Sequence, residues 1–102
     1  MHLIQILLPV FGNNGEDLLR DKYPAIRDEL VKRFGGLTAF TQSPAEGLWK
    51  GDGNHTARDD IVMVEIMVSE IQKPWWAAYR KHLQELLGQE LIVIRALPME
   101  TL

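Results

Sequence analysis

The stretch 61–69, IVMVEIMVS, is the clearest strand in the sequence and the best guide to the fold. Alternate side chains of a strand point to opposite faces of its sheet. One face of this strand carries only β-branched apolar residues: Val62, Val64, Ile66 and Val68. The other face carries Ile61, Met63, Glu65 and Met67. We therefore expect the first face to lie under helices, within the core.

Working outward from that strand, the remaining elements alternate in type. Short apolar runs that end at turn residues predict strands at 3–10 and 91–97. A further strand is predicted at 37–42. Ser43-Pro44 interrupts this strand, and it resumes at 48–50. Helices are predicted from a start between residues 16 and 24 to residue 34, and from 74 to 87, because apolar residues recur there at spacings of three and four. Gly35-Gly36 and Gly88 are typical helix stops.

The order strand, helix, strand, strand, helix, strand predicts an α+β fold of the ferredoxin-like βαββαβ kind. A four-stranded antiparallel sheet would carry both helices on one face, with the strand order 4-1-3-2. The 102 residues amount to one domain, 1–102, with no room for a second core.

The second face of this sheet is unusually apolar. An antiparallel sheet with one wet face should alternate cleanly between apolar and polar residues, but here only Gln5, Glu65 and Arg95 interrupt the apolar side chains, one in each of three strands. A large apolar patch is seldom exposed on a monomer, so we expect a homodimer in which Gln5, Met63, Glu65, Met67 and Arg95 lie in the interface. The alternative is that the loop 43–60 folds over the face.

Those three polar residues allow two interpretations. With the 4-1-3-2 order they form a row across the centre of the sheet. The row is either a polar group inside a ligand cavity or an Arg–Glu pair that fixes the dimer register. The second interpretation is favoured.

Composition excludes several functions. The net charge is −3 and no basic tract is present, so nucleic acid is not an expected partner. The absence of cysteine excludes disulfides, thiolate catalysis and cysteine metal sites, and it fits a cytoplasmic protein. Residues 1–11 are apolar, but they lack a basic start and a cleavage site and are too short to span a membrane. We expect neither a membrane partner nor a cofactor, since no phosphate loop or dinucleotide turn occurs.

Residues 46–60 hold the densest group of polar and aromatic side chains, and they supply five ligand-pocket candidates: Trp49, Lys50, His55, Arg58 and Asp59. A histidine near carboxylates can act as a general base, and a lysine or arginine can hold an anionic substrate. The alternative, which is favoured, is a solvated hairpin whose charges pair across strands. The three histidines are not spaced as a metal pair on one helix, so no metal site is predicted.

The second helix supplies three more pocket candidates. Trp76 belongs to the apolar face of this helix, whereas its neighbour Trp75 shares a flank with Tyr79 and His82. Trp75 either lines the edge of a pocket or covers the seam between helix and sheet, and the seam is favoured.

The segment Gly47-Leu48-Trp49-Lys50 with the glycine-containing turn and Arg58-Asp59 resembles a family of small bacterial proteins of unknown function, and Trp75-Trp76 to Tyr79 is similar to other hypothetical bacterial proteins. The whole pattern is more distantly similar to the dimeric α+β barrel superfamily. That superfamily includes cofactor-independent monooxygenases and muconolactone isomerase-like enzymes. No catalytic motif of these families matches here residue by residue, so none is transferred.

Two functions follow as hypotheses. The first is a homodimeric small-molecule-binding protein, with a cofactor-free enzyme of the barrel type as one form of it. Its pocket would lie between sheet and helices, closed by residues 43–60. The second is a structural or regulatory interaction module without catalysis. A cavity lined by His, Trp and a carboxylate favours the first, and a filled core favours the second.

Overall fold

The computed structural model describes residues 1–50 and 56–102, and for residues 41–50 and 56–59 it describes the backbone alone. The described elements, in chain order, are β1 (His2–Pro9), α1 (Leu18–Asp21), α2 (Tyr23–Phe34), β2 (Thr38–Lys50), β3 (Thr56–Val68), α3 (Lys73–Leu87) and β4 (Val93–Pro98).

One four-stranded antiparallel sheet holds these strands in the order β2-β3-β1-β4, which is 4-1-3-2 when counted from β4. Strand β1 lies between β3 and β4, and Gln5 of β1 is the register partner of both Glu65 and Arg95. The prediction of an α+β fold with a four-stranded antiparallel sheet is therefore confirmed.

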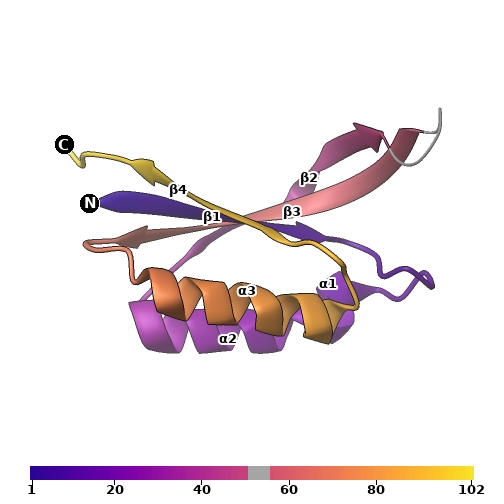
Figure 1. The fold of residues 1–102 in the computed structure, drawn as a ribbon, viewed down its shortest axis with the longest axis horizontal. Coiled ribbons are helices and arrows are strands. Elements are labelled where there is room, and N and C mark those ends of the chain that lie inside the picture. The colour runs from indigo at the N-terminus through magenta and orange to yellow at the C-terminus, as the bar shows by residue number, and fades with distance from the viewer. Residues whose placement is uncertain (51–55) are drawn as a thin grey trace.

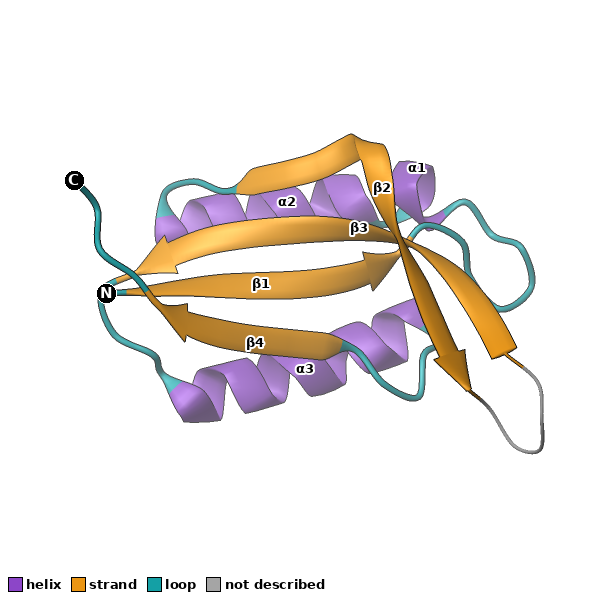
Figure 2. Ribbon diagram, turned by 90° about the horizontal axis from the view of Figure 1, so that it is seen from above, coloured by secondary structure: helices purple, strands orange, loops and turns teal. Residues whose placement is uncertain are grey.

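Helices α2 and α3 both lie beneath the sheet (Figure 1), and Figure 2 shows α2 on the β2–β3 side and α3 on the β4 side. The sheet face that they cover carries the β-branched residues expected there: Val62, Val64, Ile66 and Val68 of β3, next to Ile4, Ile6 and Leu8 of β1. Each helix turns its apolar stripe toward that face. The buried helical residues are Tyr23, Ile26 and Leu30 of α2, and Trp76, Tyr79, Leu83 and Leu87 of α3. This single layer of helix on sheet forms the core.

The helix boundaries follow from capping. Gly35 and Gly88 adopt positive φ angles of 87° and 63° and end α2 and α3 where the sequence predicts. The structure adds the short helix α1, in which the Asp17 carboxylate accepts a hydrogen bond from the Arg20 backbone N–H at 3.1 Å. Pro24 lies in the first turn of α2, where a backbone N–H would have no partner within the helix, so the absence of one is tolerated.

The β2–β3 hairpin differs in extent from the prediction. Strand β2 is one element from Thr38 to Lys50, and its interruption is a register shift between Phe40 and Ala45 opposite β3. Strand β3 begins at Thr56, five residues before the predicted start. The hairpin extends beyond the ends of α2 and α3 and away from both helices (Figure 1). Figure 2 looks onto the second face of the sheet, where the tail after β4 crosses the start of β1 and no described segment lies over the middle of β1 or of β4. Within the described chain, the alternative that residues 43–60 cover this face is therefore not observed.

Candidate functional site

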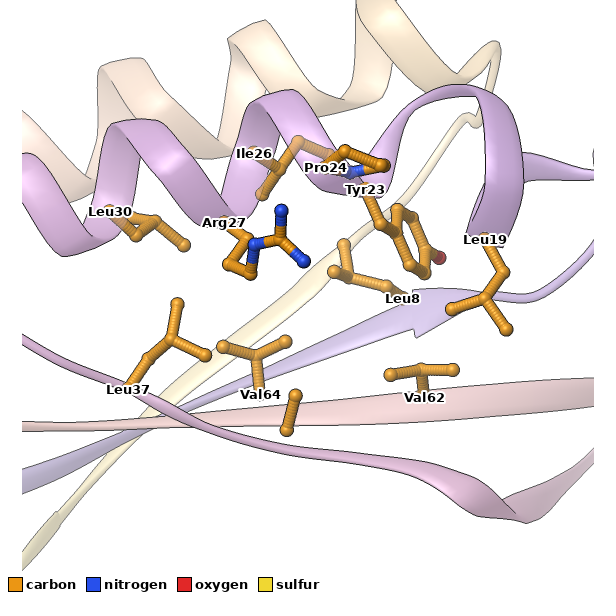
Figure 3. A pocket seen from close by; sticks show the side chains of 11 residues that line it. Leu8, Leu19, Tyr23, Pro24, Ile26, Arg27, Leu30, Leu37, Val62 and Val64 are labelled. Carbon is orange, nitrogen blue, oxygen red and sulfur yellow. The ribbon is translucent and has the colours of Figure 1, made fainter.

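A cleft of about 400 Å³ opens between α2 and the covered face of the sheet (Figure 3). It is lined by side chains of β1, α1, α2, β2 and β3, together with Leu37: Leu8, Leu19, Tyr23, Pro24, Ile26, Arg27, Leu30, Leu37, Ala39, Val62 and Val64. Apart from Arg27 and the Tyr23 hydroxyl, these side chains are apolar. The cleft has the size and lining of a small-molecule site.

The walls of the cleft belong to the core, and its rim is open. Leu30 and Val62 are fully buried, whereas Pro24, Arg27 and Ala39 are exposed. Ala39 is the register partner of Val64 and faces the same side of the sheet. The side chain of Ala39 is smaller than the valines and isoleucines that β1 and β3 place on that side, and this small residue helps to leave the space beside α2 open.

Tyr23 fixes one wall of the cleft. Its hydroxyl donates a hydrogen bond to the carbonyl oxygen of Pro9, at the end of β1. Burial raises the pKa of Tyr23 well above its ordinary value, because the phenolate would lose its hydration. The hydroxyl is therefore a neutral, already partnered group, and not an acid or base available to a ligand at neutral pH.

Arg27 is the one charged residue among the described lining residues. Figure 3 shows its guanidinium group over the cleft, between Leu30 and Tyr23. Its Nε donates to the Oδ1 of the adjacent Asp28 at 3.3 Å, and both side chains are largely exposed. Because the Nε–Oδ1 distance is long and both groups are solvated, the interaction of Arg27 with Asp28 is weak. The other N–H groups of the guanidinium can still donate hydrogen bonds to an anion.

Residues of this cleft were not singled out as site residues by the sequence. The one available signal was Ala39, a small residue on the helix-facing side of a strand. The apolar spacing on α2 identified Tyr23, Ile26 and Leu30 as core residues, and that spacing does not distinguish a filled core from a cleft.

The hairpin candidates lie at one end of the molecule. Trp49 and Lys50 pair with Ala57 and Thr56, and Arg58 and Asp59 pair with Leu48 and Gly47. His55 lies outside the described residues. Strand β3 is 13 residues long, so its first residues lie on the order of 40 Å from its last, where α3 begins. The described backbone therefore does not bring the hairpin candidates together with Trp75.

Trp75, Tyr79 and His82 form an aromatic series along α3. Trp75 stacks on Tyr79 with ring centroids 4.8 Å apart, and the rings of Tyr79 and His82 are 5.9 Å apart. Trp75 also meets the edge of Phe34 on α2 at 5.3 Å, and the Arg33 guanidinium lies 4.2 Å from the centre of its ring. Trp75 thus covers the seam between α3 and α2, while the predicted seam was the one between helix and sheet.

A second, more polar groove of about 430 Å³ adjoins this seam. Its lining residues come from α2, the end of β3, the loop that follows β3 and the start of α3: Arg33, Phe34, Met67, Val68, Ser69, Glu70, Gln72, Trp75 and Trp76. Trp75 therefore also lies at the edge of a groove. Tyr79 and His82 are not part of the described lining of either hollow.

The polar row on the second sheet face is present as predicted. Gln5 Nε2 donates to Glu65 Oε2 at 2.9 Å, and Arg95 Nε donates to Gln5 Oε1 at 2.6 Å. Glu65 and Arg95 are not in direct contact, because β1 separates their strands. The row lies on the surface opposite the cleft.

Other kinds of site find no support within the described part of the chain. No cluster of three or more His, Cys, Asp or Glu side chains there has the arrangement of a metal site. Among the described helices, none is both long and apolar enough to span a membrane.

Comparison with known proteins returns no match to any protein-family model, curated protein or solved structure. The cleft and the open sheet face are therefore the features of this chain that bear on its function.

Proposed function

We propose that this chain is a small-molecule-binding protein whose site is the cleft between α2 and the sheet, and that it works as a homodimer. The observation that carries the binding function is a space of about 400 Å³ that ten uncharged side chains and one arginine line. Typical ligand pockets have a volume of about 300–1,000 Å³, mostly apolar walls and a few polar groups that fix orientation.

The lining indicates the class of ligand. Apolar walls favour an aliphatic or aromatic body, because burying it removes apolar surface from water. Arg27 at the rim favours an anionic end, since a guanidinium group pairs readily with a carboxylate or a phosphate. The proposed ligand is therefore an apolar molecule with one terminal anionic group, such as a medium-chain carboxylate.

The site supports binding and not a reaction. Among its described lining residues, Tyr23 and Arg27 are the only ones with polar side-chain atoms, and the Tyr23 hydroxyl is engaged with the Pro9 carbonyl. Nucleophilic catalysis requires a nucleophile beside a base, and acid–base catalysis requires a titratable group near neutral pH. Neither arrangement occurs among these residues.

The homodimer and the fold type belong to the same proposal. We assign the fold to the ferredoxin-like type and the assembly to the dimeric α+β barrel type, in a cytoplasmic protein. The strand order counted from β4 and the two helices on one face support the fold type. Four large apolar side chains on the open face support the dimer, since Phe40, Met67, Val93 and Leu97 are 40–59% exposed.

Octanoate and 1-octanol test the ligand class by isothermal titration calorimetry. Octanoate is expected to bind once per protomer. Arg27→Gln should weaken octanoate binding by roughly tenfold, the value of one charge-assisted hydrogen bond, and should leave octanol binding unchanged. Equal losses of affinity for octanoate and for octanol would show that Arg27 does not recognise the anionic end of the ligand.

Ala39→Trp tests the place of binding. Ala39 is exposed at the rim, so a tryptophan there can fill the cleft without removing a core side chain. Ala78→Trp on the exposed side of α3 is the matched control. Octanoate binding should be lost in the first variant and kept in the second. Binding that survives in both variants would place the ligand elsewhere, and absence of binding to the wild-type protein would favour an interaction module.

A further inference from the structure

The open sheet face carries one polar row between apolar rows. The polar row runs across β3, β1 and β4 as Glu65, Gln5 and Arg95. The register places Met67, Leu3 and Leu97 in one flanking row, and Met63, Leu7 and Val93 in the other, with Phe40 beside Met63. The only formal charges in these three rows are therefore one negative and one positive charge, on either side of a neutral centre.

Gln5 holds the two charges apart. Its amide nitrogen donates to Glu65 and its amide oxygen accepts from Arg95, so both ends of the amide are used. Neither Glu65 nor Arg95 takes part in an ion pair between described residues. Since neighbouring strands are about 4.8 Å apart, the two charged residues sit about 10 Å apart on β3 and β4. The side chains of Glu65 and Arg95 can therefore each still form an ion pair with an opposite charge on another molecule.

A second copy of the chain supplies those charges in one orientation. When two identical sheets pack face to face, their twofold axis lies in the plane between them. An axis that runs along β1 through Gln5 exchanges the two sides of the row. It places Glu65 of each protomer opposite Arg95 of the partner subunit, and it places apolar rows opposite apolar rows. An axis that runs across the strands places Glu65 opposite Glu65 of the partner subunit, which is repulsive.

The usual dimensions of packed sheets agree with this arrangement. Packed sheets lie about 10 Å apart, a gap that long glutamate and arginine side chains reach across together. Aligned sheets usually cross at about −30°, which displaces groups this close to the axis by only a few ångströms.

We infer that the open face binds a second copy of this chain about a twofold axis parallel to β1, with two Glu65–Arg95 ion pairs across the interface. This inference rests on the homodimer of the proposed function and specifies its geometry. The partner is a second copy because the charge row is complementary to itself under that axis. The ion pairs set orientation, and the flanking apolar rows supply most of the affinity.

Charge reversal tests the axis. Glu65→Arg places arginine opposite arginine at both ends of its own homodimer, and Arg95→Glu places glutamate opposite glutamate. Each variant alone should dimerise at least about 100-fold more weakly than the wild type, because like charges face each other in the interface. An equimolar mixture of the two variants should form a heterodimer, in which every facing pair is opposite in sign. The double variant Glu65→Arg with Arg95→Glu should also recover the homodimer.

Analytical ultracentrifugation measures these affinities, and Lys81→Glu on the exposed side of α3 controls for charge change alone. A mixture of wild type and Glu65→Arg that dimerises better than either alone would indicate the axis across the strands and overturn the inference. Wild-type dimers that tolerate all reversals would show that another surface associates. A wild type that stays monomeric up to high micromolar concentration would overturn the homodimer itself, while octanoate binding remains a separate test of the cleft.

A milder pair of variants covers the case in which a reversal prevents folding, as judged by circular dichroism. Glu65→Gln and Arg95→Gln each remove both ion pairs from their own homodimer. Their mixture retains one ion pair, so it should form a heterodimer tighter than either homodimer. If the two homodimers and the heterodimer all had the same affinity, the proposed Glu65–Arg95 pairing would be overturned.

Discussion

Two buried tyrosines differ in a single hydrogen bond. Tyr23 donates to the Pro9 carbonyl, whereas the buried hydroxyl of Tyr79 has no partner among the described residues. We expect Tyr23→Phe to lower the free energy of unfolding by about 0.5–1.5 kcal/mol, because it leaves a carbonyl without its donor. Tyr79→Phe should change it by about 0 kcal/mol or raise it slightly, since the hydroxyl is desolvated without compensation. Urea unfolding at pH 7 measures both, and an equal loss in both variants would contradict this difference.

The same residues predict how stability depends on alkaline pH. Burial raises the pKa of Tyr23, and burial together with the nearby Glu29 carboxylate raises the pKa of Tyr79. The folded state therefore keeps protons that the unfolded state begins to release near pH 10. Linkage then makes the contribution of both residues complete below pH 10 and progressively lost above it. Unfolding midpoints at pH 9 and pH 11 should differ less in the double variant Tyr23→Phe with Tyr79→Phe than in the wild type, and equal differences would exclude these phenols as the cause.

Residue-level features were predictable where a strand register determines them. Gln5, Glu65 and Arg95 could be placed in one row because side-chain alternation and strand order suffice for that. A pocket between sheet and helices was predicted, but its lining residues were not, because they depend on how closely α2 packs on the sheet and on the small Ala39 side chain. Local sequence patterns do not encode the distance between two packed layers.

At the scale of elements, an aromatic cluster joins the two long helices. Trp75 contacts Arg33 and Phe34 of α2 across the seam, and Phe34 stacks on Trp76 of α3 at 5.3 Å. We expect Trp75→Ala to cost about 1–3 kcal/mol in unfolding free energy, less than a fully buried tryptophan, because the ring is only partly covered. A double-mutant cycle with Arg33→Ala should show a coupling of about 0.5–1 kcal/mol from the cation–π contact. A coupling near zero would mean that the guanidinium adds nothing to the seam.

The sequence predicts elements well where one local rule dominates. The end of α2 at Gly35 and the end of α3 at Gly88 follow from left-handed caps, and β3 follows from its alternation. The hairpin was predicted too short because residues 56–60 are polar apart from Ala57 and carry no apolar alternation. Strand pairing with β2 extends β3 through these residues, and backbone hydrogen bonds across a hairpin do not require apolar side chains.

At the scale of the whole molecule, the two faces of the sheet differ in how they are covered. The covered face is closed by helices but leaves a cleft beside α2, whereas the other face is open over the middle of β1 and of β4 within the described chain (Figure 2). The two surfaces lie on opposite sides of the sheet. The proposed ligand binding and the proposed association should therefore respond independently to substitutions on one side or the other.

The proposed association through the open face would make stability depend on protein concentration. If folding is coupled to dimer formation, a 100-fold increase in concentration should stabilise the dimer by about 2.7 kcal/mol and raise the urea midpoint. Met67→Lys should remove most of this dependence, because Met67 is 59% exposed in the protomer and a charge there would be buried by the partner. Glu85→Lys, at an exposed position on α3, introduces the same side chain away from the sheet and should keep the dependence. A wild-type midpoint that is constant over this range would show that the protomer folds alone and leaves its apolar rows in water, whereas a loss of dependence in both variants would assign the interface to the helical side.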